Sequence, residues 1–127
     1  MTATPPYEDI YVNLIGFVPP RIQHRLRLER ECDSQLLDII ETLRERAMYP
    51  DSMDVKTAQM ILFAVLLANL APAAKLHARA AMRAGATKKE LHDVAALTFL
   101  FRGLSALNMA SEIINELFDE AEAAKTA

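Results

Sequence analysis

Apolar residues recur along the chain at intervals of three and four, and strictly alternating stretches are rare. That spacing puts apolar side chains on one face of an α-helix, whereas a half-buried strand alternates. Glycine, proline and capping residues interrupt the pattern at several points. The sequence therefore predicts an all-α bundle of about six to seven helices. The expected helices run from Tyr7 to Leu14, from Arg21 to Glu31, from Asp33 or Ser34 to about Met48, from Ser52 or Asp54 through Leu67, from Pro72 to just before Gly85, from the capping box Thr87–Glu90 to just before Gly103, and through Leu107 and Phe118, with Ala121–Ala127 expected to fray.

Two of these helices differ in how apolar they are. The third carries one broad stripe that is expected to face the core, made of Leu36, Leu37, Ile39, Ile40 and Leu43. The fourth is apolar almost all round, which is typical of a central helix or of one that a partner subunit covers. Its longest apolar run, Met60–Ala68, has nine residues, whereas a membrane-spanning helix needs about 20. We therefore expect no membrane partner.

The composition narrows the class of protein further. With 127 residues, 52% of them hydrophobic, the chain suits a single domain, residues 1–127, with a sizeable core. The net charge of -3 lacks the basic excess of nucleic-acid-binding proteins, so no nucleic acid is expected as a partner. A single cysteine, Cys32, excludes an internal disulfide and a Cys-x-x-Cys pair. Together with an N-terminus that lacks the pattern of a signal peptide, it predicts a cytoplasmic protein.

His77 is the best candidate for a residue that carries chemistry. It lies in an alanine-rich helix, where small side chains let helices approach closely, on a face shared with Ala73, Ala74, Ala80, Ala81 and Ala84. A neutral imidazole held there could accept or donate a proton. The alternative is a structural histidine that is hydrogen-bonded in the core or at a subunit contact. His24 and His92 are expected at the surface, and no HxxxH, HxH or ExxH pair is present, so no metal or other cofactor is expected.

Two arginines are candidates for binding a substrate carboxylate, because a guanidinium group can hold a carboxylate by two hydrogen bonds. Arg102 precedes Gly103 at the break between the last two helices, and Arg25 belongs to the highly charged second helix. Each has a structural alternative. Arg102 could form a salt bridge between subunits, and Arg25 could lie on a solvated helix face and pair with Glu29.

Four short segments in the second half of the chain form a series. They are Leu76-His77-Ala78-Arg79-Ala80-Ala81, Gly85-Ala86-Thr87-Lys88-Lys89-Glu90-Leu91, Phe101-Arg102-Gly103 and Ala106-Leu107-Asn108. In order and spacing, the stretch from about residue 54 to residue 116 resembles the carboxymuconolactone decarboxylase and alkylhydroperoxidase D-like (AhpD-like) family. The resemblance implies an AhpD-like helical fold. It also implies that the chain's partner is itself, in a homotrimer or homohexamer with sites near the subunit contacts.

The departures from the family pattern concern its redox chemistry. Where the peroxidase branch has Cys-x-x-Cys-x-x-x-His, this chain has Leu70, Ala73 and His77, and the usual relay glutamate falls near Ala58. A thiol peroxidase needs a thiolate nucleophile and a resolving thiol, so that mechanism is not expected.

The resemblance is nearer to the decarboxylase branch because of the segment around His77. It implies a cofactor-free enzyme, either a lyase of the decarboxylase type or an isomerase. Its substrate would be a small carboxylated acid, either a lactone or an acid of aromatic catabolism. His77 would be the general acid or base, and Arg102 or Arg25 would hold the carboxylate. The alternative is a non-catalytic oligomer that binds a ligand or has a structural role, which the apolar residues Leu70, Ala73 and Leu97 favour.

Overall fold

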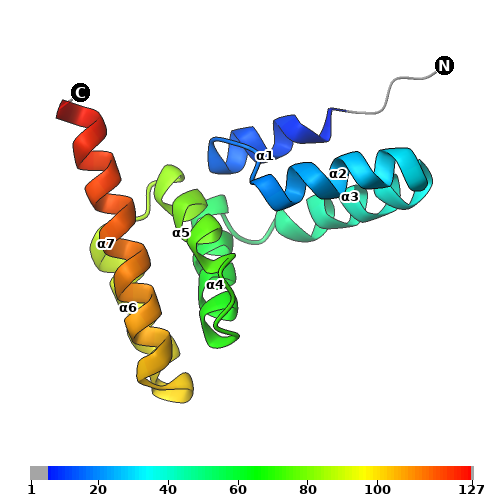
Figure 1. The fold of residues 1–127 in the computed structure, drawn as a ribbon. Helices are drawn as coiled ribbons and strands as arrows, with labels where there is room; N and C mark the ends of the chain where they lie inside the picture. Colours follow the sequence, from blue (N-terminus) through cyan, green and yellow to red (C-terminus); the bar gives the residue numbers. More distant parts are fainter. Residues whose placement is uncertain (1–5, 127) are drawn as a thin grey trace. The chain divides into compact units, whose positions relative to one another are not determined.

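The computed structural model describes residues 6–126, which contain seven helices and no strand (Figure 1). The helices are α1 Tyr7–Ile15, α2 Pro20–Cys32, α3 Ser34–Met48, α4 Val55–Ala68, α5 Ala74–Arg83, α6 Lys88–Arg102 and α7 Leu104–Thr126. The prediction of an all-α protein is therefore confirmed. The chain divides into two compact units, Met1–Ser52 with α1–α3 (unit 1) and Met53–Ala127 with α4–α7 (unit 2). That both belong to a single domain stays a prediction.

Two predicted helix boundaries differ from the observed ones. Pro72 does not open the fifth helix but lies in the turn before α5, where its carbonyl accepts a hydrogen bond from the Lys75 N–H at 3.2 Å. The predicted fraying of the last residues is wrong as far as the chain is described, because α7 continues to Thr126; Ala127 lies outside the described residues. Alanine, glutamate and lysine dominate this stretch, and all three favour helix.

In unit 1, α2 packs against α3, and tyrosine side chains of α1 reach α3. The broad apolar stripe predicted for the third helix is wrong in part. Leu37 is buried, whereas Leu36, Ile39 and Leu43 are 44%, 65% and 65% exposed. Because α3 has only α1 and α2 to pack against within this unit, it buries a narrow face, and that face includes the charged residue Glu41.

Unit 2 is built around α4, which packs against α5, α6 and α7, while α6 and α7 run side by side (Figure 1). Large apolar side chains of α4 meet alanines of α5 and apolar residues of α6 and α7. The buried members of this core are Phe63, Leu67, Ala74, Ala78, Ala81, Ala86, Leu91, Ala95, Ala110, Ile113, Ile114 and Leu117.

The connections in unit 2 follow the predicted signals. Gly85, with a φ of 106°, takes the left-handed conformation that ends α5. The capping box follows directly: the Glu90 N–H donates to Thr87 Oγ1 at 3.0 Å, and the Thr87 N–H donates to Glu90 Oε1 at 2.9 Å. These bonds satisfy N–H groups that would otherwise be free at the start of α6.

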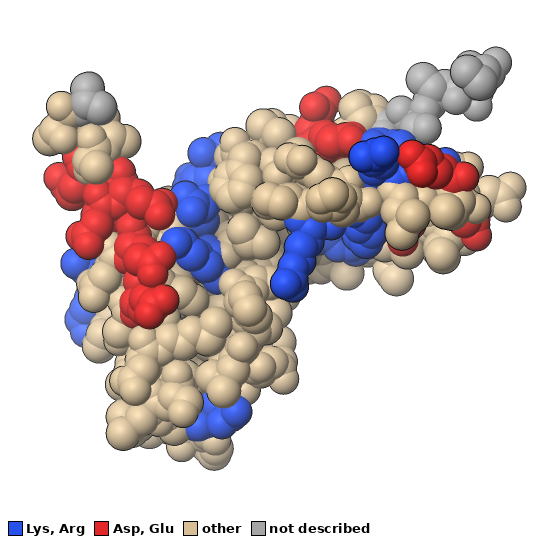
Figure 2. All heavy atoms as spheres, in the orientation of Figure 1, with Lys and Arg blue, Asp and Glu red and all other residues tan. Residues whose placement is uncertain are grey.

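Charged side chains are distributed unevenly over unit 2. Figure 2 shows Asp and Glu gathered along the C-terminal part of α7. There Glu116 and Glu120 pair with Lys75 and Arg79 of α5, which ties these two helices together at the surface. Among residues 6–126, none of the helices has both the length and the hydropathy that crossing a membrane requires.

Candidate functional site

His77 lies on α5 and contacts the polar side chain of Gln59 on α4. Its Nδ1 atom is 2.7 Å from Oε1 of Gln59. The imidazole is half-buried, whereas Gln59 is 0% exposed. Ala74, Ala78 and Ala81 of α5 are fully buried. Their small side chains let α5 pack closely against α4, as the alanine-rich pattern predicted, whereas Ala84, expected on the same face, is exposed.

The contact defines which nitrogen of His77 carries a proton. An amide oxygen can only accept a hydrogen bond, so the bond requires a proton on Nδ1. In the neutral imidazole, Nε2 then has the lone pair and is the atom that can accept a proton. Gln59 therefore fixes both the orientation and the tautomer of the ring. This is the function that an orienting group has beside a catalytic base.

The other end of the same amide is unsatisfied. Gln59 Nε2 is buried and has no hydrogen-bond partner in the described part of the chain. A buried donor without an acceptor costs about 1–3 kcal/mol. An oxygen atom of a water molecule or a ligand that accepted from Nε2 would remove that cost. The pair thus offers a base, His77, and a hydrogen-bond donor, Gln59, at one place.

Gln59 was not among the residues predicted from the sequence. The family resemblance placed the relay glutamate of the peroxidase branch near Ala58, whereas the side chain that contacts His77 is that of the next residue. A signal was present, because Gln59 directly precedes the long apolar run of the fourth helix. A polar side chain that is buried on the inner face of a helix needs a partner. For Gln59 that partner is His77.

Arg102 does not lie beside this pair. Its Nε donates to the backbone carbonyl of Ala68 at 2.7 Å, at the C-terminal end of α4. Gln59, which holds His77, lies nine residues earlier on the same helix, a separation of about 13 Å along the helix axis. Arg102 and Gln59 therefore contact separate places on α4. A role of Arg102 toward a substrate stays a prediction.

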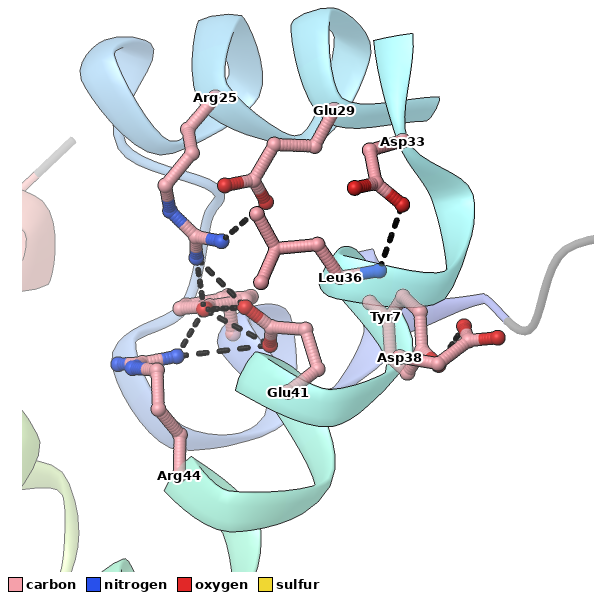
Figure 3. A network of polar contacts seen from close by, with 9 residues as sticks. Tyr7, Arg25, Glu29, Asp33, Leu36, Asp38, Glu41 and Arg44 are labelled. Carbon is pink, nitrogen blue, oxygen red and sulfur yellow. Dashed lines mark hydrogen bonds and ion pairs between the residues drawn. The ribbon is translucent and has the colours of Figure 1, made fainter. Parts of the chain in front are cut away.

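Arg25 belongs to unit 1, where it takes part in a network of buried polar side chains (Figure 3). Its guanidinium group donates to Glu41 at 2.6 Å, to Tyr11 Oη at 3.0 Å and to Glu29 at 3.1 Å. Arg44 donates to the same tyrosine and is 3.5 Å from Glu41. Glu41 is 2% exposed, so its charge depends on these two guanidinium groups. The contacts give Arg25 a structural role; a role toward a substrate stays a prediction.

Two tyrosines of unit 1 hold their protons strongly. Burial raises the pKa of Tyr11 to about 12, and the hydrogen bond that its hydroxyl donates to Glu41 at 2.9 Å acts in the same direction. The hydrogen bond that Tyr7 donates to Asp38 at 2.5 Å, together with burial, raises the pKa of Tyr7 to about 12. Neither hydroxyl can act as a proton acceptor near neutral pH, so both serve the structure of unit 1.

The remaining sequence candidates lie apart from the His77 pair or lack reactive groups. Leu70, with a φ of 51°, and Ala73 occupy the turn between α4 and α5 and carry no thiol. Cys32 is exposed at the end of α2 in unit 1. His24 and His92 are exposed, as predicted. In the range that the structure describes, no group of three or more His, Cys, Asp or Glu could hold a metal ion.

Comparison with known proteins identifies a family. No curated protein and no solved structure matches the chain significantly. The model of the carboxymuconolactone decarboxylase family matches residues 34–116. The match and the resemblance both end at residue 116. The match begins at residue 34 rather than at about residue 54, so it also includes α3. It contains Gln59, His77 and Arg102 but not Arg25. Because this model matches more than half of the chain, the chain belongs to the carboxymuconolactone decarboxylase family.

Proposed function

We propose that the protein is a cofactor-free lyase or isomerase that acts on a small carboxylated acid, of the lactone type or from aromatic catabolism. His77 is the general acid-base group. The observation that carries the proposal is the His77–Gln59 pair, in which a wholly buried amide orients the imidazole and retains an unsatisfied donor. Family membership supports decarboxylase-like chemistry in general.

Acid-base chemistry of this kind needs little from the protein. When the carboxylate group is lost from a carbon atom as CO2, or when a base removes a proton from that carbon, the electron pair of the broken bond is delocalised into a carbonyl group of the substrate. His77 then returns or removes the proton through Nε2, because Nδ1 donates to Gln59. The amide N–H of Gln59 donates to an oxygen of the substrate and stabilises the charge that develops there. No metal or organic cofactor has a step in this scheme.

Arg102 enters the proposal in a different way. Its guanidinium group is bound to the Ala68 carbonyl rather than to the His77–Gln59 pair, so we propose that a second copy of the chain supplies the arginine that holds the substrate carboxylate near His77. This agrees with the oligomeric site that the family resemblance implies. Arg25, already bound to Glu41, Glu29 and Tyr11, has no part in the proposed reaction.

The test is an assay of the purified protein with carboxymuconolactone-type acids, in which the ultraviolet absorbance of the substrate is followed. His77→Gln removes the proton acceptor and should lower kcat by about 100- to 10 000-fold. Gln59→Met keeps the volume of the side chain and removes the orienting oxygen, and should lower kcat by about tenfold. The matched control, His24→Gln, changes an exposed histidine and should leave kcat unchanged.

The nitrogen resonances of His77 separate orientation from catalysis. In the parent protein we expect the pattern of the tautomer protonated at Nδ1, and in Gln59→Met a mixture of tautomers. If His77→Gln retained full turnover, or if His77 populated mainly the tautomer protonated at Nε2, the assignment of Nε2 as the base would be wrong.

A non-catalytic family member is the second candidate, and one observation favours it. At the two positions where the peroxidase branch has its thiols, the turn between α4 and α5 carries the apolar residues Leu70 and Ala73. In that case His77 and Gln59 are a structural pair. His77→Gln would then lower the free energy of unfolding, while neither the parent protein nor the variant would convert any of the acids.

We also propose that the chain assembles with itself, as a homotrimer or homohexamer, and works in the cytoplasm. Apolar side chains near the α6–α7 corner support assembly: Leu97, Leu100, Phe101 and Leu104 are 67%, 67%, 98% and 63% exposed. Monomeric proteins rarely expose such clusters. Phe101→Glu should reduce the mass measured by light scattering, whereas Ala124→Glu, at an exposed position near the end of α7, should not. A monomeric parent protein would contradict the proposal.

A further inference from the structure

The surface between α6 and α7 holds a pocket that the His77 site does not include. Its floor is apolar and consists of Ala95 of α6 and of Leu107 and Ile114 of α7. Its volume is about 170 Å³, close to the roughly 150 Å³ of a cavity that accepts benzene. The pocket therefore suits a molecule with one small ring or a short apolar chain.

Polar side chains form the rim of this pocket. Lys88 and His92 stand one turn apart on α6, and Ser111 and Asn115 stand one turn apart on α7. Residues four apart lie on the same face of a helix, so each helix presents two polar groups to the same opening. An apolar floor with a few convergent polar groups is the usual composition of a site for a small molecule.

The charge of the rim is positive and is not neutralised. Within the described residues, Lys88 is the one lysine that has no acidic partner, whereas Lys56, Lys75, Lys89 and Lys125 each form an ion pair with a glutamate or aspartate. Both acidic residues of α6 already have partners: Glu90 pairs with Lys56 at 3.0 Å, and Asp93 pairs with Lys89 at 2.7 Å and with His92 at 2.9 Å. The ammonium group of Lys88 is therefore available to an anion.

Two polar side chains of α7 determine which polar groups of a ligand the pocket can bind. The Ser111 hydroxyl donates to the Leu107 carbonyl at 2.7 Å, so its oxygen can still accept a hydrogen bond but has no second proton to donate. Asn115 can both donate and accept. A carboxylate would find its donors in Lys88 and Asn115, and a hydroxyl group on the same molecule would find its acceptor in Ser111.

We infer that this pocket, defined by Lys88, Asn115 and the floor around Ala95, binds a small organic carboxylate with a single ring or a short apolar chain. The carboxylate lies between Lys88 and Asn115, and the apolar part covers Ala95 and Ile114. The inference concerns a binding site apart from His77 and does not depend on the proposed reaction. A protein without lyase activity would still have it.

The experiment is a titration of the full-length protein, labelled with nitrogen-15, with benzoate and in parallel with benzamide, which has the same shape without the charge. We expect benzoate to shift the amide resonances of residues 88–95 and 107–115, with a dissociation constant on the order of 1 mM, because so small a ligand makes few contacts. Benzamide should bind at least several-fold more weakly. Equal shifts with both compounds, or benzoate shifts located elsewhere, would overturn the inference.

Two variants and a control locate the charge. Lys88→Gln should weaken benzoate binding about two- to fivefold, the range that an exposed ion pair supports. Asn115→Asp places a carboxylate opposite the ligand and should abolish binding. Both positions are exposed, so both variants are expected to fold. Lys89→Gln removes the neighbouring lysine, which does not line the pocket, and should retain the parent affinity. Equal losses in the two lysine variants would show nonspecific attraction and would contradict a defined site.

Discussion

The two units of this chain bury polar groups of different kinds. Unit 1 encloses a carboxylate, Glu41, and surrounds it with two guanidinium groups and a tyrosine hydroxyl. Unit 2 encloses a neutral amide, Gln59, and gives it one partner, His77. A buried charge without partners costs several kcal/mol, on the order of 3–5, and an unpaired amide N–H costs about 1–3. The unpaired amide is the less costly of the two, so unit 2 can retain a buried donor, Gln59 Nε2, that another molecule could use.

The largest effect that separates the two kinds of core is expected in unit 2. Phe63→Ala removes a ring that is 0% exposed from the centre of α4 and should lower the free energy of unfolding by about 4 kcal/mol, because the closely packed helices cannot fill the cavity. Urea denaturation followed by circular dichroism measures it. Phe63→Leu, which retains most of the volume, should cost clearly less. Equal losses would show that packing does not dominate this core.

Unit 1 should respond most strongly to the loss of its central charge. Glu41→Leu leaves Arg25 and Arg44 without their shared partner and should cost about 3 kcal/mol. Both guanidinium groups are about a third exposed, at 30% and 34%, so water can partly replace the carboxylate. The control is Glu31→Gln, since the Glu31–Arg27 pair is exposed on both sides and should contribute less than about 1 kcal/mol.

Tyrosine fluorescence allows the unfolding of unit 1 to be measured separately. The sequence has three tyrosines, at positions 7, 11 and 49, and no tryptophan, so intrinsic tyrosine fluorescence reports on unit 1 alone. If Glu41→Leu lowered the midpoint seen by circular dichroism without changing the fluorescence transition, the network would not be what holds unit 1 together.

Alkaline pH should also distinguish the units. The pKa values of Tyr7 and Tyr11 are raised to about 12 in the folded chain, above their ordinary value of 10. A raised pKa means that folding favours the protonated hydroxyl, so its contribution is complete below pH 10 and is lost as the pH rises from 10 to 12. Unit 2 contains no tyrosine. The raised pKa of Lys75 reflects a partly exposed pair with Glu116 and has a smaller effect.

A pH titration followed by tyrosinate absorbance tests this difference. Two tyrosines should ionise late and together with the loss of structure in unit 1, and the third, Tyr49, should ionise earlier. Tyr11→Phe should remove one late step and part of the loss of stability between pH 10 and 12. Ionisation of all three tyrosines near pH 10, with the helices intact, would contradict the buried network.

The smallest expected effect concerns the cap at the N-terminus of α6. Thr87→Ala removes the hydroxyl that accepts from the Glu90 N–H at the start of α6, and should cost about 1 kcal/mol. Thr87→Ser retains that acceptor and should cost only a small part of this. If both variants lost the same amount of stability in urea, the cap would contribute through the methyl group rather than through the hydrogen bond.

The sequence by itself determined the features that depend on neighbours along the chain. Helical spacing, the capping box at Thr87–Glu90 and Gly85 were sufficient to place the helices, because each of them acts within a few residues. The order and spacing of the segments around His77 were sufficient to indicate the family, and the family model confirmed it. The absence of paired cysteines was visible in the same way.

Only the tertiary structure decided which side chains meet. The contact between Gln59 and His77 joins residues 18 positions apart on two helices, and the network around Glu41 joins three helices. A periodic pattern identifies the apolar face of a helix but not the polar partner across from it, nor how much of that face its neighbours can cover. For the same reason Leu36, Ile39 and Leu43 were expected in the core and lie exposed, while the charged Glu41 is the residue buried beside them.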